Sequence, residues 1–357
     1  MRILTIIGAR PQFIKAAAVS RALNEFTDIE EVIIHTGQHF DSNMSKVFFE
    51  ELHLPKPNYN LNINSLSHGA MTGRMIESIE EVFIKEKPDY VLVYGDTNST
   101  IAGALAAKKL HIKVAHIEAG LRSFNIKMPE EINRILTDRI SDILFCPTDE
   151  AVNNLNNEGF KNIDCQIIKN GDVMQDAALY YKEFARKPNF ELPDNFILLT
   201  LHRAENTDDL DKLKNIISTL NDIHKKVPIV WLIHPRTKHV IKSESICVNF
   251  HVFDPVGYLE MIYLIEHCQL VMTDSGGLQK EAFFFSKNCI TLREETEWVE
   301  LVEGGFNILA GSDNYKINNG LNIMLAKNND FSVDLYGKGQ ASKIIATQLK
   351  SQKKTND

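Results

Sequence analysis

The stretch EAGLRSFNIKMPEEINR, from Glu118 to Arg134, concentrates acids and arginines directly after the apolar run VAHI. The stretch GDTNST adds Asp96 at the end of an earlier apolar run. Carboxylates that lie close together cannot all ionise easily, so such a cluster can supply a general acid and a general base near neutral pH. For Glu131 we prefer the ordinary explanation, an acid at the positive end of a helix dipole. The candidates for acid–base catalysis are therefore Asp96, Glu118, Glu130 and Arg134.

The stretch GARPQFIK combines features that suit a diphosphate. It places Gly8 after an apolar run, Pro11 near a helix start where its missing N–H costs little, and the cations Arg10 and Lys15 close by. A helix N-terminus and cations both attract phosphate. The stretch matches neither a Walker loop nor G-x-G-x-x-G, and an ordinary turn with solvated cations explains it equally well.

The stretch TDSGGLQKEA has the same design in the second half of the chain. Ser275, Gly276 and Gly277 precede a helix, so the backbone N–H groups of the two glycines could approach a phosphate closely. Glu281 follows one turn into that helix, where it could accept hydrogen bonds from sugar hydroxyls. Ser275 does not stand in a G-x-S-x-G motif, which argues against a nucleophilic serine. Glycine-capped helix starts are common, so the stretch by itself is a weak signal.

Histidines supply a further candidate. TLHRAEN places His202 after the first apolar run of the second half, and LIHPRTK adds His234. A single histidine is more often structural than catalytic. His202 is the stronger candidate because we expect it to face the carboxylates across a cleft. The pair His35 and His39 is interrupted by a strand end and a glycine, so no metal site is expected there.

Apolar, β-rich runs alternate with helix-length segments along the chain. The first half contains ILTIIG, VIIHTG, YVLVYGD, VAHIEAG and ILFCPT, and the second half contains FILLTL, IVWLIHP, NFHVFD, LVMTDSG and NCITLRE. This is the βαβ pattern of parallel sheets, whose strands are apolar throughout because helices cover both faces. Ligands of such sheets bind beyond the carboxyl ends of the strands, where the candidate residues stand.

The alternation of β-rich runs with helix-length segments begins once in each half of the chain, which predicts two doubly wound α/β domains. A chain of 357 residues also exceeds what one hydrophobic core usually organises. We expect an N-terminal Rossmann-like domain at 1–172 and a C-terminal, nucleotide-binding domain at 173–338. Residues 339–357 are expected to form a helix that packs back on the N-terminal domain, followed by a disordered tail.

Composition excludes several classes of function. The net charge of −8 gives no general attraction to nucleic acid or anionic membrane. No apolar run is long enough to span a bilayer, and the N-terminal run lacks a signal-peptide cleavage pattern, so we expect a cytoplasmic protein. The five cysteines show no C-x-x-C spacing, and we assign them neither disulfides nor zinc: Cys146, Cys165, Cys247, Cys268 and Cys289.

Six stretches occur in order across nearly the whole chain: GARPQFIK, YGDTNST, HIEAGLRS, PEEINR, TLHRAEN and TDSGGLQKEA. Together they resemble the non-hydrolysing UDP-N-acetylglucosamine 2-epimerase family. The resemblance implies a GT-B-like pair of Rossmann-like domains with a central cleft, a UDP-sugar substrate and a homodimer. It also implies elimination of UDP to a 2-acetamidoglucal and its re-addition with inverted configuration at C2, without a metal or cofactor.

The resemblance also assigns roles to the candidate residues. On the diphosphate side it places Arg10, Lys15 and His202, and in the nucleotide pocket Ser275, Gly276, Gly277 and Glu281. Around the sugar, handling the C2 proton, it places Asp96, Glu118, Glu130 and Arg134. The carboxylates would stabilise an oxocarbenium-like ring while the cations stabilise the departing UDP.

Three departures from the family pattern matter. The chain reads ETEWVE where typical members read TTERPE, so Trp298 replaces an arginine near the nucleotide. The segment RSFNIKM is short, and both features resemble the branch that acts on UDP-2,3-diacetamido-2,3-dideoxyglucuronate. The additional amide and carboxylate of that sugar could bind to Lys127, Arg122 or Arg236. GQHFD, with Phe40 and Asp41, replaces a QHRQ-like stretch, which predicts weak or absent activation by UDP-N-acetylglucosamine.

Other readings stay open at this point. The same architecture serves glycosyltransferases, which need an acceptor and show no C2 exchange without one. A hydrolysing epimerase would release free N-acetylmannosamine, although the forms PEEINR and GARPQFIK argue against it. A non-catalytic UDP-sugar-binding regulator would gain nothing from carboxylates beside a diphosphate, so it is the least favoured.

Overall fold

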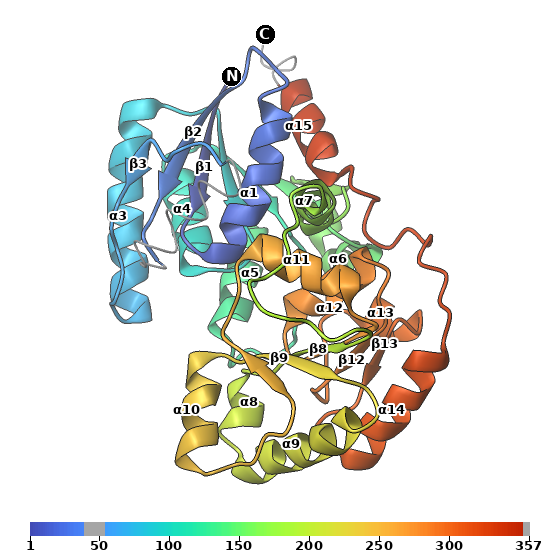
Figure 1. Ribbon diagram of the computed structural model, residues 1–357. Coiled ribbons are helices and arrows are strands. Elements are labelled where there is room, and N and C mark those ends of the chain that lie inside the picture. The colour runs from blue at the N-terminus through green and yellow to red at the C-terminus, as the bar shows by residue number, and fades with distance from the viewer. Residues whose placement is uncertain (39–53, 353–357) are drawn as a thin grey trace. The chain divides into compact units, whose positions relative to one another are not determined.

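The computed structural model describes residues 1–38 and 54–352, and it forms two compact units (Figure 1). Unit 1 comprises Met1–Ala177 together with Asp334–Asp357, and unit 2 comprises Ala178–Val333. Each unit is built on one parallel sheet with its own core. No helix in the described part of the chain is both long and apolar enough to cross a bilayer.

The sheet of unit 1 has the strand order β3-β2-β1-β4-β5-β6-β7, and every pairing is parallel. Its inner strands are apolar and buried along most of their length, as expected for a sheet with helices on both faces. The strands are β1 (Arg2–Ile7), β2 (Glu30–His35), β3 (Tyr59–Asn60), β4 (Tyr90–Tyr94), β5 (Lys113–Ile117), β6 (Ile143–Cys146) and β7 (Gln166–Lys169).

Helices connect these strands, and local signals start several of them. Pro11 stands in the first turn of α1, and the Thr97 side chain accepts a hydrogen bond from the Thr100 N–H at the start of α4. The C-terminal helix α15 packs against α1 within unit 1 (Figure 1). The helices are α1 (Arg10–Leu23), α3 (His68–Glu86), α4 (Asn98–Lys109), α5 (Pro129–Ile140), α6 (Asp149–Asn157), a 3-10 turn (Phe160–Asn162), α7 (Val173–Lys182) and α15 (Ala341–Gln352).

The sheet of unit 2 has the order β10-β9-β8-β11-β12-β13, again with parallel pairings. Its strands are β8 (Ile197–Thr200), β9 (Ile229–Leu232), β10 (His251–Phe253), β11 (Leu270–Thr273), β12 (Cys289–Thr291) and β13 (Asn307–Leu309). Its helices are α8 (Ala204–Thr207), α9 (Leu210–His224), α10 (Pro235–Ser243), α11 (Tyr258–His267), α12 (Gly276–Phe284), α13 (Val299–Glu303) and α14 (Asn314–Ala326).

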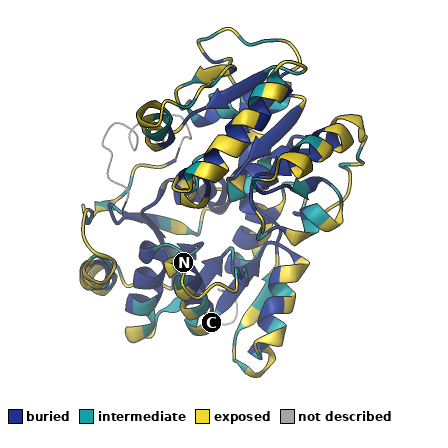
Figure 2. Ribbon diagram, turned by 90° about the horizontal axis from the view of Figure 1, so that it is seen from below, coloured by how far each residue is buried: buried dark blue, intermediate teal, exposed yellow. Residues whose placement is uncertain are grey.

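Both sheets reverse their strand order at one place, and this determines where ligands can bind. The order runs outward in both directions from β1 and β4 in unit 1, and from β8 and β11 in unit 2. This is the Rossmann arrangement, in which the ligand site lies beyond the carboxyl ends of the strands at the reversal. The inner strands of both sheets are buried in Figure 2, whereas many helical residues are exposed. The ligand site is therefore expected among the residues that follow these four strand ends.

Candidate functional site

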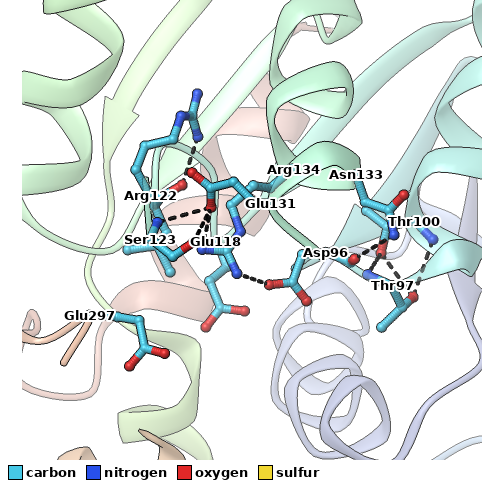
Figure 3. Close-up of polar contacts among 12 residues, drawn as sticks. Asp96, Thr97, Thr100, Glu118, Arg122, Ser123, Glu131, Asn133, Arg134 and Glu297 are labelled. Atoms are coloured by element: carbon cyan, nitrogen blue, oxygen red, sulfur yellow. Dashed lines mark hydrogen bonds and ion pairs between the residues drawn. The ribbon is translucent and has the colours of Figure 1, made fainter. Parts of the chain in front are cut away.

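Two of the acids predicted from the sequence, Asp96 and Glu118, lie beyond β4 and β5 in unit 1 (Figure 3). Asp96 follows β4 after a single glycine, and Glu118 follows β5 directly. Each carboxylate has a cation: Arg134 of α5 pairs with Asp96, and Lys15 of α1 pairs with Glu118. The structure thus brings together residues that stand far apart in the sequence.

The backbone between these acids is unusual. Gly95 has φ +62°, and a side-chain carbon there would lie 3.1 Å from a carboxylate oxygen of Glu118. Glu118 itself has φ +72°, in the left-handed region that non-glycine residues rarely adopt. Such a conformation costs on the order of 1–3 kcal/mol and is concentrated at functional sites. The strain points to a functional role for the Glu118 carboxylate.

Electrostatics set Asp96 apart from an ordinary surface acid. Burial raises its pKa, the Arg134 charge opposes that rise, and the neighbouring Glu118 charge adds to it. The net result is a raised pKa, which moves Asp96 towards exchanging protons near neutral pH. Its side chain is still 34% exposed, so a ligand can reach it.

Two adjacent glutamates have different environments. Glu131 is buried and accepts hydrogen bonds from the Ser123 N–H and hydroxyl, both at 2.9 Å, and from the Phe124 N–H at 3.0 Å. It also pairs with Arg134 at 3.2 Å, so it organises the loop before α5 and orients the arginine. Glu130 is exposed, and the described residues give its carboxylate no hydrogen bond or ion pair. Its catalytic role stays a prediction.

The start of α1 differs from a simple phosphate cradle. The side-chain oxygen of Gln12 accepts hydrogen bonds from the N–H groups of Gly8 at 2.8 Å and Ala9 at 2.9 Å. These donors are therefore already used, and Lys15 is paired with Glu118. The side chain of Arg10 lies outside the described residues, as do His39, Phe40 and Asp41, so the roles suggested for these residues stay predictions.

In unit 2, Asp274 organises the residues beyond β8. It is fully buried, and its carboxylate accepts hydrogen bonds from the backbone N–H groups of His202 at 2.9 Å and Arg203 at 2.8 Å. The His202 ring nitrogen Nδ1 lies 3.3 Å from the same carboxylate, with its side chain 38% exposed. Asp274 was not among the predicted site residues, although it stands directly before Ser275 in TDSGG.

The N-terminus of α12 lies beside this loop, at the carboxyl end of β11. Ser275 is the N-cap, and no described side chain caps the helix. Gly277 is exposed, with open space where a side chain would stand, and Glu281 lies on the same helix. The first N–H groups of α12 are therefore oriented to receive an anion.

Trp298, the residue that departs from the family pattern, packs at the start of α12. Its indole N–H donates a hydrogen bond to the Gly276 carbonyl oxygen at 2.9 Å, and the Lys280 ammonium lies 3.8 Å from its ring centroid. Arg293 was also missed by the sequence analysis. It is buried and pairs with Glu205 at 3.0 Å and Glu297 at 3.1 Å.

Two of the cations suggested for an additional sugar carboxylate are committed to acids. Arg122 is buried and pairs with Asp138 and Glu158, both at 2.7 Å. The hypothesis that it binds substrate is therefore wrong for the described structure, because its guanidinium is enclosed. Arg236 pairs with Asp208 on the surface. Lys127 is exposed and stays available.

The family model described as UDP-N-acetylglucosamine 2-epimerase matches residues 21–350. The chain belongs to this family. A relative from Pseudomonas aeruginosa, named UDP-2,3-diacetamido-2,3-dideoxy-D-glucuronate 2-epimerase, is 58% identical over 351 residues, covering 98% of this chain and 99% of the relative. A Methanococcus maripaludis UDP-N-acetylglucosamine 2-epimerase is 46% identical, covering 98% of each chain.

Solved structures of UDP-GlcNAc 2-epimerases are also similar to this chain. The Methanocaldococcus jannaschii UDP-GlcNAc 2-epimerase in complex with UDP-GlcNAc and UDP is 45% identical, with a TM-score of 0.88, covering 98% of this chain and 100% of that one. The Neisseria meningitidis enzyme bound to UDP-GlcNAc is 32% identical, with a TM-score of 0.86 and the same coverage. The predicted family, the GT-B-like α/β fold class and the isomerase class of this family member are confirmed.

Proposed function

We propose that this epimerase inverts C2 of a UDP-N-acetylhexosamine, and that UDP-2,3-diacetamido-2,3-dideoxyglucuronate is the preferred substrate over UDP-N-acetylglucosamine. The observation that carries the first part is the pair of acids beyond β4 and β5, each with its own cation. The 58% identity to the Pseudomonas aeruginosa relative supports the second part. Synthesis of a surface polysaccharide precursor is the proposed context.

The two carboxylates suit the two proton transfers of an epimerisation. One carboxylate removes the C2 proton while the C1–O bond to UDP breaks, which leaves a double bond between C1 and C2. The ion pair with Lys15 favours the charged form of Glu118, as a base requires. The raised pKa of Asp96 favours a protonated form that can return a proton to the opposite face as UDP adds back to C1.

We assign the UDP portion of the substrate to unit 2. The N-terminus of α12 offers N–H donors and a positive dipole end to the diphosphate. His202, held by Asp274, adds a ring beside that helix start, and Glu281 could accept hydrogen bonds from the ribose. Lys15 and Arg10 are proposed to stabilise the negative charge that develops on departing UDP.

The remaining expectations from the family resemblance are also proposals. We expect a homodimer, a cytoplasmic location and a reaction without a metal or other cofactor. The sedimentation coefficient of the purified protein tests the homodimer. Turnover that is unchanged after prolonged dialysis against EDTA tests the reaction without a metal, and a loss of turnover restored by added metal would contradict it.

The deciding experiment is proton NMR in deuterated water with each of the two UDP-sugars in turn. Elimination and re-addition replace the C2 proton by solvent deuterium and produce the sugar with inverted configuration at C2. We expect this product with both sugars, formed faster from the diacetamido-glucuronate. Deuterium without inversion would restrict the activity to proton exchange, and no deuterium with either sugar would overturn the proposal.

A further inference from the structure

His116, on β5, lies directly behind the candidate acids and is fully buried. Its ring nitrogen Nε2 is 2.7 Å from the carbonyl oxygen of Gly95, and Nδ1 is 2.7 Å from the Asp138 carboxylate oxygen Oδ1. Both distances are those of strong hydrogen bonds, and that to the carboxylate falls in the range of charge-assisted bonds. Both nitrogens therefore face oxygen atoms that ordinarily accept hydrogen bonds.

The partners of the His116 ring determine where its protons must lie. A carbonyl oxygen can only accept, so Nε2 must carry a proton. Asp138 Oδ2 already accepts hydrogen bonds from the Gly120 N–H at 3.1 Å and from Arg122 at 2.7 Å, and this carboxylate also faces Nδ1. A second proton must lie between Nδ1 and Oδ1, because two acceptors at that distance would repel each other.

The surrounding charges are balanced by that second proton. Asp138 and Glu158 supply two negative charges, and Arg122, which pairs with both, supplies one positive charge. A proton between His116 and Asp138 makes the set neutral, so the cost of burying these charges is offset by their partners.

This buried set connects the backbone on both sides of the catalytic acids. Gly95, whose carbonyl oxygen accepts the hydrogen bond from Nε2, directly precedes Asp96. His116 lies two residues before Glu118, and Gly120, held by Asp138, lies two residues after it. Asp138 belongs to α5, the helix that also carries the arginine paired with Asp96. A shift of the ring would therefore move both acids.

We propose that His116, hydrogen-bonded to both Asp138 and Gly95, is a positioning residue for the epimerisation: its bond to the Gly95 carbonyl oxygen fixes Asp96 relative to Glu118. The role in catalysis rests on the proposed function, whereas the two hydrogen bonds do not. His116 itself touches no substrate in this proposal. Its effect is on the geometry of proton transfer, and a misplacement of about 1 Å can lower a rate about 100-fold.

Two substitutions separate the two hydrogen bonds of the ring. The amide nitrogen of asparagine replaces Nδ1, so His116→Asn keeps the bond to Asp138 and loses the bond to Gly95. The amide nitrogen of glutamine replaces Nε2, so His116→Gln keeps the bond to Gly95 and loses the bond to Asp138. Each variant removes one buried hydrogen bond of the same set, so we expect similar losses of stability.

The kcat values of the two His116 variants should distinguish a positioning role from a merely structural one. We expect His116→Asn to lower kcat about 100-fold with KM within about threefold, and His116→Gln to lower kcat by less than about fivefold. Thermal unfolding of both variants measures the loss that a merely structural residue would produce. Equal kcat losses in the two variants, or losses that follow the melting temperature alone, would overturn the positioning role.

The hydrogen bond to Gly95 is tested on the unaltered protein without substrate. Nitrogen-15 NMR of protein labelled at histidine should show one buried ring whose Nε2 carries a proton that exchanges slowly with water. A buried ring whose Nε2 carries no proton would overturn this half of the proposal, even if neither variant folds. Absence of C2 exchange in the unaltered protein would instead overturn the proposed function and leave this result standing.

Discussion

The two units place polar residues at equivalent positions of similar sheets, yet they use their acids differently. In unit 1, Asp96 and Glu118 pair with side-chain cations and remain partly exposed beyond the strand ends. In unit 2, Asp274 is fully buried, and its carboxylate accepts backbone N–H groups of the loop that carries His202. One acid pair is arranged to exchange protons, and the other acid is arranged to hold a loop.

The difference follows from what surrounds each carboxylate. A carboxylate that accepts several backbone N–H bonds is fixed in its place. A carboxylate that combines partial burial with a neighbouring acid has a raised pKa, as Asp96 does, and holds a proton more readily. Unit 1 is therefore expected to determine turnover, and unit 2 to determine affinity for the UDP group.

The sharpest test of this division is Glu118→Gln, which keeps the shape of the side chain and removes its basicity. We expect kcat to fall about 1000-fold, within the range that general acid–base groups supply. The affinity for UDP should stay within about tenfold, or about 1.4 kcal/mol. Steady-state kinetics and calorimetric titration with UDP measure the two quantities.

A matched control for this prediction is Glu150→Gln, at an exposed position in the first turn of α6. It removes the same charge from unit 1 and should leave both kcat and UDP affinity unchanged. Equal losses of turnover and UDP affinity in Glu118→Gln would mark Glu118 as structural, and the proposed division of work between the units would fail.

Asp274→Asn should show the opposite pattern in unit 2. The amide oxygen can still accept the N–H bonds of His202 and Arg203, because both reach the same carboxylate oxygen, but the change removes the negative charge that strengthens these bonds. We expect a loss of about 2 kcal/mol in the free energy of unfolding and a UDP affinity lowered about tenfold. At saturating substrate, kcat should stay within about threefold.

Asp254→Asn is the control for that change, because Asp254 is 76% exposed and pairs with the surface residue Lys238. A surface ion pair contributes little, so stability and UDP affinity should be unchanged. If Asp274→Asn lowers kcat far more than affinity, the loop of unit 2 takes part in the chemical step.

The comparison also shows what the sequence could establish. Apolar runs predicted the strands, and the order of motifs predicted the family, the GT-B-like fold and the general place of Asp96 and Glu118 at strand ends. Asp274 was missed although it stands within a quoted motif, because nothing in TDSGG distinguishes a buried carboxylate from an exposed one. Arg122 was misread for the same reason. Its pairing with Asp138 and Glu158 depends on tertiary contacts that spacing does not encode.

The smallest expected effect concerns His202. Burial lowers its pKa, the nearby Asp274 charge opposes that change, and the charges of Arg203 and His234 add to it. A lowered pKa leaves the ring mostly neutral at pH 7, and the protonated ring attracts a diphosphate more strongly. The affinity for a UDP-sugar, whose diphosphate has no secondary ionisation, should therefore increase about threefold from pH 8 to pH 6 as the proton is taken up. Calorimetric titration across this range measures the effect, and His202→Gln should abolish it. A dependence that persists in His202→Gln would assign the titration to another group and leave unit 2 with the helix N-terminus as its main determinant of affinity.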